Sequence, residues 1–420
     1  MQRGRRWAAA ALVVSVTTAV TAVAAGAGAA GAVTVRAAAG EPSAGAAETG
    51  SPAGGFVPAK LPLQGAVLST GVRLDAHTTW AAGFRIADDG QHTGFAPVVV
   101  ARDSPGGQWK ELPSPAPDFD GRATALAGSS PHDAWLLGDL DPRSGRFLAG
   151  HWNGTAWTAT EIERPPGELT TGYLLGASAP RRGSAWAVGG ASVVTDRRPS
   201  PAPGGSTEVV TRTTGLIEHW DGAAWHRLEP PAIDGDWWLN SVTEIAPDDV
   251  WAVGNTSYPD DRPVLLHYDG RGWSRVDAPA FPGLYGEYQS VAGTPGDVWV
   301  VGRAVLADKD RGHPLVAHYD GRTWTTVPVP EGVAGKLWSV TAVPGGMAAV
   351  GWDASGEQDR PLGLRYTRGR WQTLDLSVPG CPTSSYQAVV SDPGGRLTVI
   401  GAGSTAKAPQ YQPLLLTGRG

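Results

Sequence analysis

A motif of about fifty residues recurs along this chain of 420 residues. Consecutive copies begin at Ser241, Ser290 and Ser339, and each contains a hydrophobic run ending in glycine, as in "DVWAVG". The equivalent glycines lie 55, 51, 65, 48, 49 and 50 residues apart and are Gly83, Gly138, Gly189, Gly254, Gly302, Gly351 and Gly401. A fixed period of this length is typical of propellers and other repeat architectures. The chain therefore contains seven units, and the long interval marks an insertion in the third.

Within a unit the apolar residues alternate with a period of two, which predicts strands and not helices. A Pro-x-Asp group, such as Pro247-Asp248-Asp249, supplies the first turn, and Asp269-Gly270 supplies a tight hairpin before the last strand. Each unit therefore contains four short antiparallel strands. Seven such units predict an all-β fold, a seven-bladed β-propeller with four-stranded antiparallel blades.

The two ends of the repeat region predict how the ring closes. The seventh unit stops after its third strand, whereas residues 56–63, "FVPAKLPL", resemble the fourth strand "QWKELPSP" of the first unit with Phe56 in the place of Trp. We therefore expect the propeller to span residues 56–420 and the N-terminal strand to complete the last blade, which leaves no open sheet edge.

The first residues have the composition of an export signal. Residues 1–25 combine Arg3, Arg5 and Arg6 with an Ala- and Val-rich run and small-x-small sites, which predicts a secretory signal peptide. An uncleaved membrane anchor is the alternative, and Arg5-Arg6 leaves a twin-arginine route open. The Ala-, Gly- and Pro-rich residues 26–55 are predicted to form a disordered linker. We expect a secreted monomer without stable membrane insertion after cleavage.

Charge and cysteine content exclude several classes of function. A net charge of −6 and a pI near 5.9 provide no basic surface for nucleic acid. The single cysteine, Cys381, cannot form a disulfide within the chain, and no cysteine stands near the predicted cleavage region to carry a lipid. The sequence also lacks G-x-S-x-G, H-E-x-x-H, C-x-x-C and phosphate-loop motifs, so no cofactor or metal is predicted.

The unit resembles the kelch and galactose-oxidase group of propellers, in which a hydrophobic strand ending in Gly is followed by Tyr-Asp and then Trp. The resemblance covers residues 56–420, and the chain also looks like the Trp-rich "DVWAVG" repeats of secreted bacterial propellers. Only Gly189-Gly190 shows the kelch double glycine, and the Tyr268 to Trp273 spacing is shorter than in kelch repeats. A copper-radical oxidase of this group needs a Cys joined to a Tyr; Cys381 and Tyr386 are the one nearby pair.

Residues that recur once in each unit are interpreted as structural. One such position holds a histidine before Trp or Tyr in four units: His151, His219, His267 and His318. Four copies around a ring cannot converge on one substrate. A second position holds the tryptophans Trp157, Trp225, Trp273, Trp324 and Trp371, which we expect to pack the blades.

Ligand binding is expected where the sequence departs from the repeat. If the first strand of each blade lines the channel, one face of the disc carries the blade-to-blade connections and the variable loops between second and third strands; we call it the loop face, and the other, with the short turns, the turn face. Loops held by a rigid scaffold are where binding usually resides. Candidate ligand-binding residues at the entry to the first strands are Tyr173, Trp237, Trp238, Tyr285, Tyr288, Trp338 and Tyr386, with the acids Asp234, Asp236 and Glu287.

Aromatic rings beside carboxylates suit sugars, since rings stack on the sugar face and acids bond to hydroxyls. The alternative is that these rings only plug the channel mouth or pack between blades. The sequence therefore predicts a secreted, non-catalytic propeller that binds an extracellular carbohydrate or protein. The second hypothesis is a carbohydrate-active enzyme, a glycosidase or lyase, in which Asp234, Asp236 and Glu287 supply acid and nucleophile.

Overall fold

The computed structural model describes residues 55–88, 93–116, 119–141, 145–199, 207–257, 261–307, 310–356, 360–381, 383–404 and 412–419. The predicted signal peptide and almost all of the predicted linker lie outside these residues. Within them every regular element is a β-strand, and no helix has the length and hydrophobicity needed to cross a bilayer.

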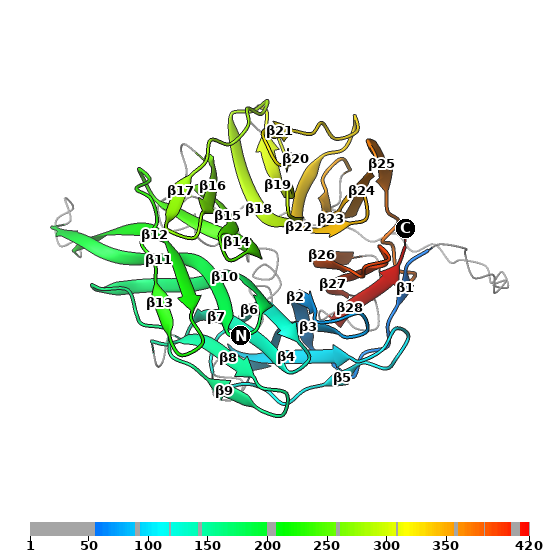
Figure 1. The fold of residues 1–420 in the computed structure, drawn as a ribbon, viewed down its shortest axis with the longest axis horizontal. Coiled ribbons are helices and arrows are strands. Elements are labelled where there is room, and N and C mark those ends of the chain that lie inside the picture. Colours follow the sequence, from blue (N-terminus) through cyan, green and yellow to red (C-terminus); the bar gives the residue numbers. More distant parts are fainter. Residues whose placement is uncertain are drawn as a thin grey trace, which may run out of the picture.

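The strands form seven sheets of four antiparallel strands each, arranged as a ring (Figure 1). Blades 1 and 2 contain β2 (Ala66–Arg73), β3 (Thr79–Asp88), β4 (Thr93–Arg102), β5 (Lys110–Glu111), β6 (Ala123–Ser130), β7 (Asp133–Leu140), β8 (Phe147–Trp152) and β9 (Trp157–Ala159). Blades 3 and 4 contain β10 (Leu169–Arg181), β11 (Ser184–Arg198), β12 (Glu208–Trp220), β13 (Trp225–Arg227), β14 (Trp237–Ala246), β15 (Asp249–Thr256), β16 (Pro263–Tyr268) and β17 (Trp273–Arg275).

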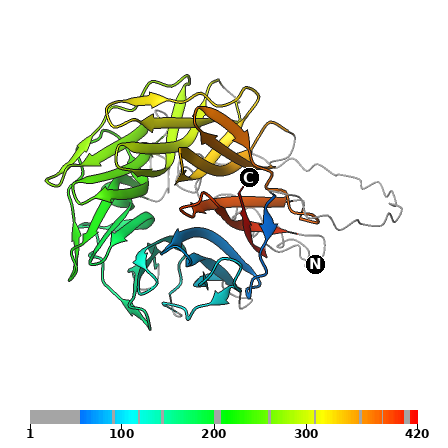
Figure 2. The same cartoon turned by 45° about the vertical axis from the view of Figure 1, so that its right-hand side comes forward.

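Blades 5 and 6 contain β18 (Tyr285–Thr294), β19 (Asp297–Val305), β20 (His313–Tyr319), β21 (Trp324–Thr326), β22 (Gly335–Val343), β23 (Gly346–Asp353), β24 (Arg360–Thr367) and β25 (Arg370–Thr373). Blade 7 contains β26 (Thr383–Ser391), β27 (Leu397–Ser404), β28 (Gln412–Gly418) and β1 (Val57–Pro58). The first strands of neighbouring blades contact one another around the axis, and Figure 2 shows the blades standing side by side around it. The predicted seven-bladed propeller is confirmed.

The N-terminal strand closes the ring, as predicted. β1 pairs antiparallel with β28 in the register Val57↔Thr417 and Pro58↔Leu416, and the Ala59 amide donates to the Leu415 carbonyl at 2.8 Å. Phe56 packs against the core of blade 7. The first and last segments of the propeller therefore hold one sheet together.

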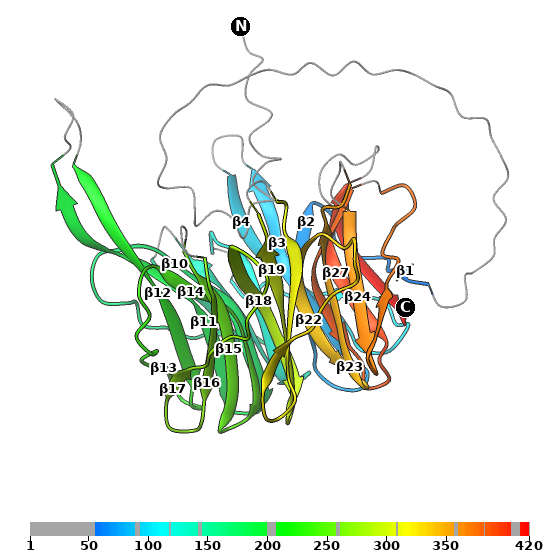
Figure 3. The same ribbon diagram turned by 90° about the horizontal axis from the view of Figure 1, so that it is seen from above.

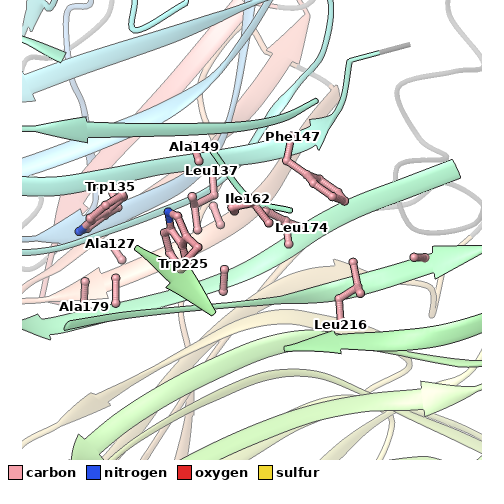
Figure 4. Close-up of a cluster of buried hydrophobic side chains, with 14 residues drawn as sticks. Ala127, Trp135, Leu137, Phe147, Ala149, Ile162, Leu174, Ala179, Leu216 and Trp225 are labelled. Atoms are coloured by element: carbon pink, nitrogen blue, oxygen red, sulfur yellow. The ribbon is translucent and has the colours of Figure 1, made fainter. Parts of the chain in front are cut away.

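The repeated tryptophans join neighbouring blades. The second-strand Trp of one blade meets the fourth-strand Trp of the next edge to face: Trp135 with Trp225 at 5.1 Å, Trp186 with Trp273 at 5.5 Å and Trp251 with Trp324 at 5.2 Å between ring centroids. Figure 4 shows the first of these pairs within the core shared by blades 2 and 3. The prediction that these rings pack the blades agrees with their positions.

The repeated histidines act within their own blades. His267 lies over the Trp251 ring at 4.2 Å between centroids, and its Nε2 is 3.0 Å from Oδ1 of Asp249, which also accepts the Trp251 Nε1–H at 2.8 Å. His151 and His318 pair in the same way with Asp133 and Asp297, at 2.6 and 2.7 Å. His219 meets the hydroxyl of Ser184, which replaces the Asp in blade 3. The Asp-x-Trp motif and the histidine thus form a clamp in blades 2, 4 and 5, and Ser184 takes the place of the Asp in blade 3.

The serine that begins each repeat connects adjacent first strands. Ser241, Ser290 and Ser339 accept hydrogen bonds from the backbone amides of Val291, Val340 and Val389 in the following blades, at 3.3, 3.2 and 3.1 Å. Each serine directly follows a β-bulge in its strand. These bonds connect the first strands of blades 4, 5, 6 and 7 in series.

The insertion in the third unit forms regular structure and not only a loop. β11 and β12 have 15 and 13 residues, whereas β15 and β16 of blade 4 have 8 and 6. Their pairing continues to Arg198↔Glu208, so a two-stranded ribbon projects beyond the disc on the loop face (Figure 3). Both arms contain consecutive β-branched residues, Val193-Val194-Thr195 and Val209-Val210-Thr211, which favour this extended pairing.

Candidate functional site

One layer of residues at the channel mouth breaks the repeat. The seven equivalent glycines that end the hydrophobic runs, here called the phase glycines, pack against the backbone of the first strand of their blade. A Cβ at Gly302 would stand 1.9 Å from the Glu287 carbonyl oxygen, and all seven show the same close approach. The residues whose carbonyls make this contact, and those that follow the glycines, vary from blade to blade. We call this set the mouth layer: Val67, Phe84, Arg122, Asp139, Tyr173, Gly190, Trp238, Asn255, Glu287, Arg303, Lys336, Trp352, Ser385 and Ala402.

The mouth layer is apolar on one side and charged on the other. Val67, Phe84 and Ala402 form a small cluster with Phe95, which covers blades 7 and 1. Blades 2, 5 and 6 carry the ionisable groups. A ligand at the mouth therefore meets two chemically distinct sides.

Blades 5 and 6 hold a cluster of ion pairs. Nζ of Lys336 and Nε of Arg303 lie 2.7 and 3.0 Å from the same oxygen, Oε1 of Glu287. Burial by itself would raise the pKa of Glu287, but the charges of Lys336 and Arg303 outweigh it and hold that pKa below its ordinary value. Burial lowers the pKa of Lys336 to about 8, although Glu287 opposes the shift.

Two predicted aromatic residues lie beside this cluster and remain partly accessible. Trp338 is half-buried, and Nζ of Lys336 lies 4.0 Å from its ring centroid, a cation–π contact. Tyr285 is half-buried at the start of β18. The structure therefore brings Tyr285, Glu287 and Trp338 to one sector of the mouth.

The other predicted rings are buried. Trp237 packs in the core shared by blades 3 and 4, where a Cβ at Gly215 would meet its ring at 2.3 Å. Nε1 of Trp238 donates to the Asn240 side chain at 3.2 Å. The side chains of Tyr288 and Tyr386 are fully buried between blades. Trp237, Tyr288 and Tyr386 thus lie in cores shared by neighbouring blades, and a small residue, Gly215, makes room for the Trp237 ring.

Two of the predicted acids lie at the start of blade 4. Asp234 is exposed, and Asp236 accepts the Thr213 amide at 3.0 Å and lies 3.7 Å from the Arg212 guanidinium. Asp236 thus connects blade 4 to the base of the ribbon. Neither is placed with Glu287 by any contact of the described residues.

Blade 2 contributes a second ionic group with an unusual carboxyl. Oδ2 of Asp139 accepts from Nε of Arg122 at 2.9 Å, while its Oδ1 is buried without a hydrogen-bond partner among the described residues. Burial raises the pKa of Asp139, and Arg122 offsets only part of that effect. The hydroxyl of Tyr173 is likewise buried and unpaired, and burial raises its pKa, helped by the charges of Asp139 and Asp236.

Sequence reasoning missed Arg122, Asp139, Arg303 and Lys336. The available signal was the residue directly after each phase glycine, which is Asp139 in blade 2 and Arg303 in blade 5. An alignment of the repeats does not mark the residue after the glycine as special. Its importance comes from the close contact between the glycine and the first strand, which appears only in three dimensions.

The copper-oxidase alternative finds no supporting contact. The Cys381 thiol donates to the carbonyls of Thr383 and Ser404, and the Tyr386 hydroxyl donates to the Leu376 carbonyl at 3.0 Å. Among the residues that the structure describes, no three His, Cys, Asp or Glu side chains gather as metal ligands would.

A hollow of about 510 Å³ lies on the turn face, which the sequence analysis did not single out. Blades 5, 6, 7 and 1 contribute its walls, with Arg73, Asp75, Asp297 and Asp392 as the charged residues. Asp75 and Asp297 are engaged by local backbone amides and by the His318 clamp, respectively. The lining of this hollow therefore combines strand ends, such as Arg73 and Thr294, with turn residues, such as Pro344 and Pro393.

Comparison with known proteins assigns the fold class. No family model and no curated protein matches the chain. The β-propeller domain of the Trilobed protease from Pyrococcus furiosus, described as having an open velcro topology, matches with a TM-score of 0.50 and 9% identity over 84% of this chain and 93% of that chain. The acylaminoacyl peptidase of Pyrococcus horikoshii matches with a TM-score of 0.50 and 10% identity over 84% of this chain and 51% of that chain.

A polysaccharide lyase, an ulvan lyase, matches with a TM-score of 0.47 and 11% identity over 73% of this chain and 80% of that chain. The likeness to the Trilobed protease domain, together with the seven four-stranded sheets, establishes a β-propeller. The chain spans about half the length of the peptidase. At such identities the shared architecture carries no information on ligand or reaction.

Proposed function

We propose that this protein is an exported, non-catalytic β-propeller that binds an extracellular carbohydrate or protein through its loop face. The observation that carries the proposal is the mouth layer, because charged and aromatic residues that differ between blades gather there on a scaffold whose repeated residues are used for packing. The partly exposed Tyr285 and Trp338 lie beside the Glu287 ion pairs, and the ribbon of blade 3 extends the same face.

Export and a monomeric state are part of this proposal and rest on residues 1–25 and on the closed ring. Kinship with kelch-like and Trp-rich secreted repeats is also part of the proposal, and it rests on the hydrophobic strands that end in Gly, as in "DVWAVG", and on the Tyr-Asp and Trp that follow them. The state of Glu287 favours binding over catalysis. An ionised carboxylate held by two cations is a poor general acid, since a general acid needs a raised pKa.

The test is a screen of the full exported chain against immobilised glycans and against extracellular proteins. Binding should be lost when Trp338 is replaced by alanine and retained when the exposed Thr158 of β9, far from the mouth, is replaced by alanine. A chain that retains neither glycan nor protein, or one whose binding ignores Trp338→Ala, contradicts the proposal.

One observation favours the second candidate, a glycosidase or lyase. Asp139 has a raised pKa and an unpaired carboxyl oxygen near the neutral Tyr173 phenol, and perturbed groups of this kind are enriched in catalytic sites. Release of sugars from a polysaccharide panel, abolished by Asp139→Asn and kept in a variant of the exposed turn-face residue Asp248, Asp248→Asn, would establish this function. No release from any polysaccharide would remove it.

A further inference from the structure

The ion cluster of blades 5 and 6 contains more cations in contact than anions. Lys336 and Arg303 both approach one oxygen of Glu287, at 2.7 and 3.0 Å. The carboxylates of Asp261 and Asp310 also interact electrostatically with Lys336 and with Arg303, respectively. Buried charges are stable only when they are paired and hydrogen-bonded, so both cations depend on Glu287, and the more accessible of the two can bind a further anion through the N–H groups that do not face Glu287.

Arg303 is the accessible member of the cluster. Its side chain is 31% exposed, whereas that of Lys336 is 5% exposed. Nε of Arg303 faces Oε1 of Glu287 at 3.0 Å, and the guanidinium has two terminal amino groups beyond that edge. A guanidinium presents its N–H groups as a planar fork, which matches a carboxylate with two parallel hydrogen bonds.

Aromatic surface lies next to this fork. The Trp338 ring is fixed by Lys336 on one side and is half-buried, and Tyr285 stands at the start of β18, the strand that carries Glu287. Such rings can stack on the apolar face of a sugar, while the Glu287 carboxylate accepts from hydroxyls. Carboxylate recognition and ring stacking are thus available within one corner of the mouth.

We propose that this corner binds an acidic glycan, a uronate-containing polysaccharide, with Arg303 holding the sugar carboxylate and Trp338 stacking on the sugar ring. This inference rests on the proposed function and names its ligand class. The net charge of −6 repels polyanions at a distance, but charges are screened beyond about 8 Å at physiological ionic strength, so the local cluster governs contact. Binding should accordingly weaken as salt is added.

The experiment measures the affinity of the full chain for polygalacturonate, for its methyl ester and for dextran sulfate. The ester removes the carboxylate charge and keeps the sugar. We expect binding to polygalacturonate, at least about tenfold weaker binding to the ester, and a loss of about tenfold or more in Arg303→Gln. The matched control is Arg275→Gln, since Arg275 is an exposed arginine of β17 in the neighbouring blade and should leave affinity unchanged.

Thermal unfolding of each variant checks that it is folded. If Arg303→Gln does not fold, Arg303→Lys replaces it: lysine keeps the charge but lacks the fork, so affinity should still fall. Equal affinity for ester and free acid, or unchanged affinity in the Arg303 variants, overturns the inference and leaves carbohydrate binding standing.

Three other results are informative. If dextran sulfate binds as tightly as polygalacturonate and its binding does not depend on Arg303, the chain recognises negative charge in general, and the inference is overturned. If this chain captures an extracellular protein and binds no glycan, the inference is overturned as well, while the broader proposal stands. Absence of every ligand refutes both.

Discussion

Replacing Trp225 by alanine tests whether the repeated tryptophans hold the blades together. Trp225 is a buried residue of β13 in blade 3, and its ring meets Trp135 of blade 2 edge to face at 5.1 Å. Its Nε1 donates to the hydroxyl of Thr160, also from blade 2, at 3.0 Å. Both contacts cross the blade boundary shown in Figure 4, so truncation opens a cavity there.

The magnitude follows from what is removed. Loss of a buried Trp side chain typically costs about 3 to 5 kcal/mol, which includes transfer and cavity terms. Trp225→Phe keeps an aromatic ring against Trp135 and loses only volume and the bond to Thr160. That bond contributes about 1 kcal/mol, so we expect the phenylalanine variant to lose about 1 to 2 kcal/mol.

The assay is urea unfolding followed by both circular dichroism and fluorescence, since coincident transitions show that one free energy describes the process. The exposed Thr158, two residues before Thr160 in the chain, provides the control. The free energy of unfolding of Thr158→Ala should stay within about 0.5 kcal/mol of that of the parent. A loss below about 1 kcal/mol for Trp225→Ala would refute the packing argument.

Three further predictions concern the clamp, the closure and the ion cluster. His267→Ala should lower the free energy of unfolding by about 1 to 2 kcal/mol and leave ligand affinity unchanged; altered affinity with unchanged stability would mean that His267 is functional. Removal of residues 55–64 should expose the edge of β28 and cause self-association in size-exclusion chromatography, and a stable monomer would contradict closure. Burial lowers the pKa of Lys336 to about 8 in the folded chain. Between pH 8 and about 10.5 the unfolded chain therefore keeps a proton on Lys336 that the folded chain has lost, so the stability of the fold rises with pH in this range. The variant Lys336→Met should lack this rise. The free energy of unfolding of both proteins is measured in urea near pH 7.5 and near pH 10, and wild type should gain stability relative to the variant at the higher pH. A difference in free energy that does not change with pH would show that Lys336 does not titrate in this window.

Most of the fold was predictable because repeated local patterns are repeated physical constraints. The period of two, the Asp-Gly hairpins and the spacing of the phase glycines each predict the same four-stranded unit, and such agreement is typical of foldable sequences. The place of Phe56 also predicted the closing strand, since the seventh unit lacks a fourth strand of its own. The insertion was harder, because its polar, Pro-rich composition gave no indication that β11 and β12 would extend into a ribbon.

The candidate site was predictable only in part. Aromatic residues at strand entries looked alike in the sequence, yet Trp237, Tyr288 and Tyr386 are buried while Tyr285 and Trp338 are partly exposed. Burial depends on whether the neighbouring blade offers a small residue, as Gly215 does for Trp237. That information lies about twenty residues or a whole blade away, outside any local pattern.

The sequence by itself determined the number of blades, their strand order and the structural role expected of the recurring His and Trp residues, because a residue that recurs at one position of several units satisfies a contact that those units share. Only the tertiary structure decided which unrepeated residues meet. Glu287 and Arg303 are cross-strand partners within blade 5, but Lys336 comes from blade 6, and the three converge only when the ring closes around a common axis. Electrostatic pairing acts over a few ångströms in space, and the sequence does not record such distances between blades.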